Sequence, residues 1–393
     1  MGDSPIFELG NKTPLQAANL PVLDKLAYDG QCGLAHPVKP GTVASTVSGT
    51  LAILGYDPLK YSIARGVVEA RGTGLKIIPG DVAFRGNWAT IDDEGKIFDR
   101  RAGRIRKGTK QLSSSLNGIK IENISVLVAA GTEHRLAVVL RGNDLGDGIN
   151  GSDPGDNFQS GAMPIVPHSM DENDKKNSRT AKLLNLFEIE ARKILTNHPV
   201  NLDRKSKNLS AANSILTREP GKFNSFPKIK RPSGYGLSGV CITGDDTISG
   251  IARITGFDVC KTRSFTANLD TDLEKKFDLA KHNLENYGVV VLHIKGCDIA
   301  AHNGEPKKKK KFLEKIDMEL GRFLNSWNKK LRIAVTADHA TCSRKGVHVD
   351  DPVPVLINGW GINPDSVKGF DEKQVLLGKF GVFRLYKLWE YFF

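Results

Sequence analysis

Hydrophobic and polar positions recur with different periods along the chain, and each period predicts a different kind of element. The segment Asn19-Leu-Pro-Val-Leu-Asp-Lys-Leu-Ala-Tyr28 is apolar at helical spacing and is followed by Asp29-Gly30, which predicts a helix ending there. The spacing of apolar residues from Leu183 to Leu195 predicts a longer helix. Residues from about 62 to 165 alternate short apolar strands with turns, at 81–91, 124–130 and 134–140. This change of period predicts a separate antiparallel α+β domain.

The C-terminal part of the chain alternates helices with continuous β-branched runs, at 288–294, 331–336 and 352–357. Such runs between helices are typical of parallel strands that are covered on both faces. The stretch 143–180 is rich in Gly, Asp, Ser and Asn and predicts a long loop. We therefore predict an α/β fold with a mostly parallel sheet sandwiched by helices (residues 1–61 and 171–393) and an inserted smaller α+β domain (residues 62–170).

Composition places the chain among ordinary globular proteins. Its 393 residues are 39% hydrophobic and 25% charged, which suits two or three domains and excludes wholesale disorder. No apolar run is long enough for a membrane span, and no secretory signal is visible, so we expect no membrane partner. The five cysteines are scattered without a CxxC pair, which predicts reduced thiols and a cytoplasmic protein.

Lys and Arg number 56 against 44 Asp and Glu, a net charge of +12 that favours an anionic partner. The one dense basic run, Lys307 to Lys311, has the spacing of a solvated helix start. Basic stretches do not alternate with aromatic residues as RNA-binding sheets require, so we expect no nucleic acid. A small phosphorylated substrate remains as the expected partner, and a homo-oligomer is left open.

Asp and His residues follow the predicted strands of the C-terminal part, where parallel α/β sheets place their active sites. Asp298 and His302 are four residues apart and would face the same way on one helical turn. Asp338 and His339 directly follow the next strand, and His348 precedes the last one. Each pattern alone is common on surfaces, but together they predict a two-metal site for phosphoryl chemistry. Mixed Asp and His ligation suits Mn²⁺, Zn²⁺ or Co²⁺ better than Ca²⁺.

Longer sequence blocks are spread over nearly the whole chain. They are Gly2-Asp3-x-Pro5, Gly10-Asn-Lys-Thr-Pro-Leu-Gln-Ala-Ala18, Leu51-Ala-Ile-Leu-Gly-Tyr-Asp-Pro58, Gly80-Asp-Val-Ala-Phe-Arg85, Asp99-Arg-Arg-Ala-Gly-Arg104, Leu140-Arg-Gly142, Asp153-Pro154, His198-Pro-Val-Asn201, Tyr235-Gly-Leu237, Asp270-Thr271 and His348-x-x-Asp-Pro-Val-Pro354. In these blocks the chain resembles the archaeal type of cofactor-independent phosphoglycerate mutase, a branch of the alkaline phosphatase superfamily. The resemblance implies an alkaline-phosphatase-like fold and the transfer of a phosphoryl group between the 2- and 3-positions of glycerate, in glycolysis or gluconeogenesis.

The resemblance also implies the cofactors and their ligands. Two divalent metal ions (Mn, Zn, Co or Mg) are expected, and no 2,3-bisphosphoglycerate. By resemblance, Asp298, His302 and His348 hold one ion, and Asp338 with His339 holds the other.

The family's nucleophile lies in a Gly-Ser-Asp-Thr-x-His segment, where this chain departs from the pattern. Counting back from Leu51 without gaps places Thr46 at the nucleophilic Ser, Val47 at the following Asp and Thr50 at the His. A Thr hydroxyl can still attack phosphorus when a metal lowers its pKa. We therefore take Thr46 as the catalytic residue.

The substrate's carboxylate and phosphate need cationic donors. By resemblance, Arg85, Arg101 and Arg104 of the inserted domain bind it across a cleft, and Arg141 and Lys276 are weaker matches. We expect the first three to form one anion pocket.

Three departures leave alternatives open. Family members begin with a strand ending in Asp-Gly-x-Gly-Asp, whose first Asp reaches the second metal, whereas this chain begins Met1-Gly2-Asp3. A start assigned at an internal Met, a truncated paralogue, or Asp3 as a substitute ligand would each account for this. Asn303 stands where the family often has an acidic residue. Together with Val47 and Thr50, these changes leave a phosphatase or phosphotransferase acting on another phosphate or phosphonate ester, or a degenerate non-catalytic member, as alternatives to the mutase.

Overall fold

The computed structural model describes residues 1–155, 158–230, 236–365 and 367–393, so Tyr235 of one resemblance block lies outside the described residues. The chain forms two compact units, which we call the metal-site unit (Met1–Ser62 and Lys228–Phe393) and the inserted unit (Ile63–Pro227). The inserted unit extends past residue 170, where the sequence analysis ended it. The reason is that α6 (Lys175–Thr196) and β7 (Ser214–Lys222) pack in this unit, with β7 paired to its sheet.

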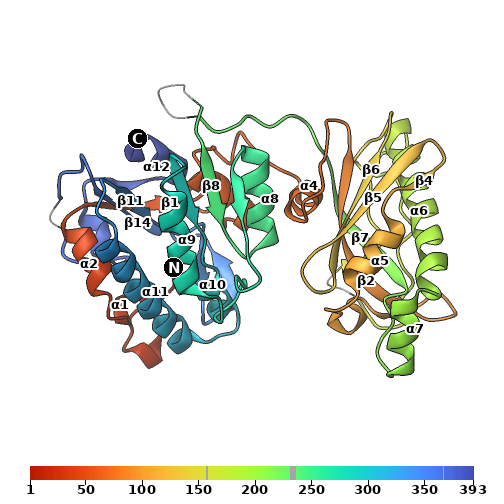
Figure 1. Ribbon diagram of the computed structural model, residues 1–393, viewed down its shortest axis with the longest axis horizontal. Coiled ribbons are helices and arrows are strands. Elements are labelled where there is room, and N and C mark those ends of the chain that lie inside the picture. Colours follow the sequence, from red (N-terminus) through yellow and green to blue (C-terminus); the bar gives the residue numbers. More distant parts are fainter. Residues whose placement is uncertain (156–157, 231–235, 366) are drawn as a thin grey trace. The chain divides into compact units, whose positions relative to one another are not determined.

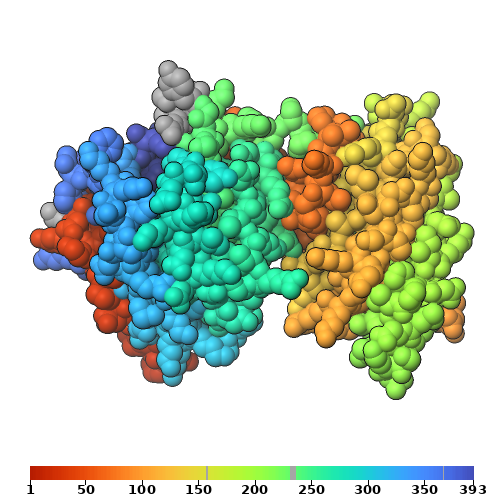
Figure 2. All heavy atoms as spheres, in the orientation of Figure 1, coloured from red at the N-terminus to blue at the C-terminus, as the bar shows by residue number. Residues whose placement is uncertain are grey.

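Helices cover both faces of the strands in the metal-site unit (Figure 1). They are α1 (Pro14–Ala17), α2 (Pro21–Tyr28), α3 (Thr46–Ile53), α8 (Asp246–Thr255), α9 (Leu273–Asn283), α10 (Gly296–His302), α11 (Pro306–Ser326) and α12 (Leu388–Phe392), with short 3₁₀ turns at Phe7–Leu9, Val375–Leu377 and Leu385–Lys387. The helix predicted at 19–28 corresponds to α2. Atoms of α9 and α11 form much of the face of this unit that is visible in Figure 2. Apolar side chains of α2, α9 and α11 share one core cluster, and α3 and α12 contribute to another.

The strands of the metal-site unit form two main sheets and a hairpin. One sheet has the order β11 (Arg332–Val335), β14 (Val353–Gly359), β1 (Gln31–His36) and β15 (Gly381–Arg384), and the other has the order β10 (Val289–Leu292), β8 (Gly239–Ile242) and β9 (Asp258–Cys260). The hairpin joins β12 (Ala340–Cys342) and β13 (Val347–Val349).

The strands in the described part of the chain therefore do not form a single, mostly parallel sheet, and the expected architecture is corrected to a mixed α/β fold. The three-stranded sheet is parallel, but β14 runs antiparallel to both β1 and β11. The β12–β13 hairpin lies between β11 and β14 and turns the chain back. The run 352–357 was correctly predicted as a buried strand, but a continuous apolar run reports burial on both faces and not direction.

The inserted unit is built on an antiparallel sheet. Its strands have the order β3 (Ile97–Asp99), β2 (Val82–Ile91), β6 (Arg135–Arg141), β5 (Ile124–Ala130) and β4 (Ile119–Ile121), with β7 paired to β2. Its helices are α4 (Arg65–Gly72), α5 (Thr109–Leu116), α6 and α7 (Pro199–Ser206), with a 3₁₀ turn at Ala102–Arg104. Phe84 and Trp88 of β2 are buried in one core with side chains of α5 and α6. The alternate residues Arg85 and Asn87 point to the opposite face of β2, and α4 packs on this strand as well.

Three further expectations can be compared with the structure. All five cysteines are free. In the described part of the chain, no helix has the length and apolar character needed to cross a membrane. The basic run begins α11 as predicted, but Lys309 is buried rather than solvated and pairs with Asp3.

Candidate metal centre

Asp298 and His302 lie one turn apart on α10, which starts directly after β10. Gly296, the first residue of α10, leaves room for the Phe312 ring of α11, because a Cβ at this position would lie 2.4 Å from that ring. The Asp298 Oδ1 and His302 Nε2 atoms are 3.3 Å apart. The spacing of four residues therefore brings the carboxylate and the imidazole together, as the sequence predicted.

His302 and His348 face each other through their Nε2 atoms, which are 3.1 Å apart. The Nδ1 atom of His302 lies 2.7 Å from the Gly346 carbonyl oxygen, and that of His348 lies 3.1 Å from the Ala44 carbonyl oxygen. A carbonyl oxygen only accepts, so each Nδ1 carries the proton in the neutral ring and each Nε2 presents a lone pair. Two acceptors turned toward one point are the arrangement expected of metal ligands whose outer nitrogen is held by the protein.

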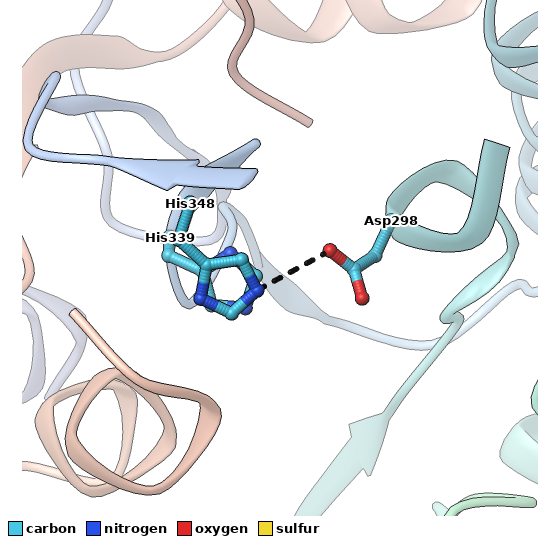
Figure 3. Close-up of side chains that lie close together, drawn as sticks. All are labelled: Asp298, His339 and His348. Carbon is cyan, nitrogen blue, oxygen red and sulfur yellow. Dashed lines mark ion pairs between the residues drawn. The ribbon is translucent and has the colours of Figure 1, made fainter. Parts of the chain in front are cut away.

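Asp298 Oδ1 completes this triangle at 3.7 Å from His348 Nε2. Figure 3 shows this ion pair between Asp298 and His348. With edges of 3.1, 3.3 and 3.7 Å, a common point lies about 2 Å from all three atoms, which matches metal–ligand distances of roughly 2.0–2.2 Å. Thr341 donates its hydroxyl to the same Asp298 oxygen at 2.8 Å and orients it. The donor set therefore fits a divalent cation of the Mn²⁺ or Zn²⁺ type.

His339 and Asp338 lie beside this triangle. Ligand atoms of Asp298, His339 and His348 are all within 4.8 Å of one another, and the His339 ring stacks on His348 with centroids 3.6 Å apart. His339 Nε2 is 3.2 Å from Asp338 Oδ2. Although burial opposes ionisation, the His339 contact and the charges of His293 and Lys295 hold the pKa of Asp338 well below its usual range. Asp338 therefore stays an anion, as a metal ligand must.

Lys295, which the sequence analysis did not single out, provides positive charge in this cluster of carboxylates. Its Nζ atom is 3.3 Å from Asp245 Oδ2 and 3.5 Å from Asp298 Oδ2. Burial disfavours its charged form, but Asp245 and the neighbouring carboxylates raise the pKa of Lys295 above its ordinary value. Lys295 therefore stays protonated and offsets the negative charge.

Thr46 is the first residue of α3, and contacts on both sides of it in sequence join this helix start to the centre. The Ala44 carbonyl contacts His348, and a Cβ at Gly49 would lie 1.9 Å from the Asp338 carbonyl oxygen. Only glycine permits so close an approach of α3 to the loop after β11. Ser45 caps the helix by accepting from Ser48 N at 3.1 Å. The positive end of the helix macrodipole thus lies at Thr46, close to the candidate metal ligands.

Asp3 is not available as a substitute ligand. Its carboxylate accepts from Lys309 Nζ at 2.8 Å and from the backbone and side chain of Ser343, and these groups are buried. It is absent from the candidate metal group found among the described residues. That alternative from the sequence is therefore corrected: Asp3 holds the N-terminal segment in place.

The arginines that lie together in the inserted unit are not the three that were expected to form an anion pocket. Arg100 and Arg218 lie around the buried Asp153 carboxylate, and Arg85 lies near Arg218 and pairs with Glu219 at 3.3 Å. Neither Arg100 nor Arg218 was among the substrate ligands predicted from the sequence. Arg100 Nη2 is 2.6 Å from Asp153 Oδ1. The buried Nε atoms of all three arginines have no hydrogen-bond partner among the described residues. Such unpaired buried donors are expected where an anionic ligand completes the site.

The other predicted substrate ligands are placed differently. Arg101 and Arg104 are exposed. Burial lowers the pKa of His134, and the nearby charges of Arg101 and Arg104 lower it further. Arg141 is bound by Asp81, with Nη2 to Oδ2 at 2.7 Å. Lys276 is fully buried and donates to the His293 carbonyl at 2.7 Å, so it supports β10 from within the core. Arg141 and Lys276 are thus each held by a partner within their own unit.

Comparison with known proteins identifies the family. A family model described as 2,3-bisphosphoglycerate-independent phosphoglycerate mutase matches residues 27–201. A protein of that name from Picrophilus torridus is 38% identical over 96% of this chain and 91% of its own, and one from Archaeoglobus fulgidus is 39% identical over the same shares. The chain belongs to the 2,3-bisphosphoglycerate-independent phosphoglycerate mutase family.

The solved structures agree with this membership. The cofactor-independent phosphoglycerate mutase from Thermoplasma acidophilum superposes with a TM-score of 0.73 at 33% identity, covering 100% of this chain and 96% of that one. A Pyrococcus horikoshii protein gives a TM-score of 0.82 at 28% identity over 100% and 93% of the two chains. The family resemblance inferred from the sequence blocks is confirmed.

Proposed function

We propose that this phosphoglycerate mutase interconverts 3-phosphoglycerate and 2-phosphoglycerate through a phosphorylated Thr46. The observation that carries the proposal is the convergence of three lone-pair donors, Asp298 Oδ1, His302 Nε2 and His348 Nε2, beside the first turn of α3. Asp338 and His339 supply ligands for a second ion next to them.

The metal ligands, Thr46 and the N-terminus of α3 have different roles in the phosphoryl transfer. Divalent cations held by these residues would supply positive charge to the phosphoryl oxygens and would lower the pKa of a hydroxyl near them. The Thr46 oxygen then attacks phosphorus as the bond from phosphorus to the substrate's 3-oxygen breaks, and the hydroxyl proton goes to the departing oxygen. Attack by the 2-hydroxyl on phosphothreonine reverses these events and returns the proton to Thr46. The N-terminus of α3 favours the negative charge that accumulates here.

The inserted unit carries arginines that can bind an anion. Arg85, Arg100 and Arg218 retain unpaired buried donors, as an anion-binding site requires. Arg101 and Arg104, exposed on the same unit, are further candidates. We assign Arg85, Arg100 and Arg218 to the carboxylate of the glycerate, because Arg100 and Arg218 are already ordered around Asp153 and Arg85 lies near Arg218.

The test is to incubate the chain with 3-phosphoglycerate and Mn²⁺ and to follow the products by ³¹P NMR. The proposal expects 2-phosphoglycerate, and no product when Asp298→Ala removes the shared ligand. Accumulation of inorganic phosphate would favour a phosphatase, the alternative motivated by Val47 and Thr50. Absence of any product despite bound Mn²⁺ would identify a non-catalytic member of the family.

A further inference from the structure

Glu188 of α6 joins two segments of the inserted unit through one carboxylate oxygen. Its Oε1 atom accepts from the Ser152 hydroxyl at 2.7 Å and from the Thr217 hydroxyl at 2.8 Å. Ser152 is 1% exposed and Thr217 is 0% exposed, so these hydroxyls need partners within the protein. The loop that carries Ser152 and the strand β7 that carries Thr217 are therefore tied to α6 at a single point.

The loop and β7 are also bonded directly to each other beside Glu188. Thr217 N donates to the Ser152 hydroxyl at 2.9 Å, and Asp153 N donates to the Thr217 carbonyl at 2.9 Å. A Cβ at Gly151 would lie 2.0 Å from that same carbonyl oxygen, so the loop backbone is in close contact with β7. Backbone contacts and the shared carboxylate thus determine together where Asp153 lies relative to β7.

The residues that follow the two hydroxyls in sequence belong to the arginine cluster, which consists of Arg85, Arg100 and Arg218. Asp153 is the next residue along the loop, and its Oδ1 atom lies 2.6 Å from Arg100 Nη2. Arg218 is the next residue along β7, where it lies opposite Arg85 of β2. Like charges at opposite positions repel, and the Asp153 carboxylate, 4.0 Å from Arg218 Nε, offsets this repulsion. A shift of the loop or of β7 at Glu188 would therefore displace the cluster.

We propose that Glu188 is a positioning residue of the anion site: it holds the loop and β7 so that Asp153 orders Arg100 and Arg218 for the carboxylate of the glycerate. This inference rests on the assignment of these arginines under the proposed function. The role requires an acceptor and not a negative charge, because both hydroxyls donate to one oxygen of Glu188. An amide oxygen at this position would serve equally well.

The experiment measures the dissociation constant of 3-phosphoglycerate by isothermal titration calorimetry with Mn²⁺ present, and KM and kcat for the formation of 2-phosphoglycerate. Glu188→Met removes the acceptor and keeps a side chain of similar length, whereas Glu188→Gln keeps an oxygen that accepts from both hydroxyls. Without the acceptor, one buried hydroxyl is left unsatisfied, because the Ser152 and Thr217 oxygens, 3.4 Å apart, can share only one hydrogen. Leu195→Ala, in the buried last turn of the same helix, is the control for a general loss of stability.

We expect Glu188→Met to raise the dissociation constant and KM roughly 3- to 10-fold at an unchanged kcat. Glu188→Gln and Leu195→Ala should bind 3-phosphoglycerate as the parent chain does. Thr217→Val should weaken binding by a similar factor. Its combination with Glu188→Met should weaken binding no further, because both changes remove the same contact.

Parent-like binding by Glu188→Met would overturn the inference, and Arg100→Ala then separates two causes. If Arg100→Ala weakens binding, the arginines bind the substrate and only the role of Glu188 is wrong. If Arg100→Ala also binds as the parent chain does, the assignment of the arginines under the proposed function fails as well. Equal weakening in Glu188→Met and Glu188→Gln, or in Leu195→Ala, would also overturn the inference, since a lost acceptor would not be the cause.

Discussion

His302 and His348 present their Nε2 atoms to each other at 3.1 Å while backbone carbonyls of Gly346 and Ala44 hold their Nδ1 atoms. Neither ring can donate to the other in its neutral tautomer. A cation between them relieves the repulsion of the two lone pairs, and protonation of one ring is the competing way to do so. Burial and the neighbouring His339 lower the pKa of His348, which disfavours that competing state.

The first prediction concerns metal affinity. His348→Ala removes one corner of the ligand triangle. We expect the Mn²⁺ dissociation constant, measured by isothermal titration calorimetry, to rise by at least about tenfold. His282→Ala, on the exposed side of α9, is the matched control and should bind Mn²⁺ as the parent chain does. Equal affinities for all three proteins would remove His348 from the centre.

The second prediction concerns the buried ion pair that holds the N-terminal segment. Lys309→Met leaves the Asp3 carboxylate buried with Ser343 and Ser4 as its remaining partners among the described residues. Removing one partner of a buried pair costs about 3–5 kcal/mol of the free energy of unfolding. Lys308→Met, at an exposed pair with Glu305, should change it by less than about 1 kcal/mol in urea titrations. A similar small loss for both variants would contradict the assigned role.

The third prediction separates the two arginine groups. Arg100→Ala removes a guanidinium that the structure places with Arg85 and Arg218, and we expect kcat/KM to fall roughly 10- to 100-fold, chiefly through KM. Arg101→Ala tests the site as the sequence suggested it, and Arg106→Ala, at an exposed pair with Glu133, is the control. If Arg101→Ala raises KM and Arg100→Ala does not, the assignment inferred from the sequence holds and the assignment of Arg100 from the structure fails.

The fourth prediction is a pH dependence of stability in the inserted unit. Burial raises the pKa of Glu188 to about 7, although Ser152 and Thr217 donate hydroxyl hydrogens to it. The folded state therefore binds a proton more tightly than the unfolded state, and stability falls as pH rises from about 4.5 to 7. The total loss is at most about 3 kcal/mol. This loss of the free energy of unfolding is complete above pH 7 and absent below the pKa that Glu188 has in the unfolded state.

Glu188→Gln should remove this dependence, because the amide oxygen still accepts from both hydroxyls and does not titrate. Urea unfolding at pH 5 and pH 8 can be followed by the fluorescence of Trp88, the tryptophan of residues 63–227, with the other three replaced by Phe. Parallel pH dependence in the variant and its parent would assign the effect to another group.

Local patterns pointed to the proposed ligands, because spacing along one helix or directly after one strand determines where side chains meet. Asp298 and His302 were recognisable from their spacing of four, and Asp338 and His339 from their place after an apolar run. Lys295, Arg100 and Arg218 act through partners far away in sequence, such as Asp245 and Asp153. Their only local signal was a charge next to a predicted element, which many surface residues share.

Strand direction and solvation were the other limits. The apolar run at β14 predicted a buried strand but not its antiparallel course, which the β12–β13 hairpin determines. Lys309 looks like its neighbours Lys308 and Lys310 in the sequence, yet helical phase turns it inward to Asp3. Tertiary partners decide such cases, and periodicity alone does not contain them.

The most direct test of the account is to trap the phosphorylated enzyme. The chain is mixed with 3-phosphoglycerate and Mn²⁺, quenched in acid within the turnover time, digested and examined by mass spectrometry. We predict a phosphoryl group on Thr46 that is lost in Thr46→Ala and retained on the new hydroxyl in Thr46→Ser. Ser45→Ala should keep Thr46 phosphorylated despite a helix-cap loss of about 1 kcal/mol. Phosphate on Ser45 or Ser48 instead, or 2-phosphoglycerate formed by Thr46→Ala at the parent rate, would show that the nucleophile is another residue.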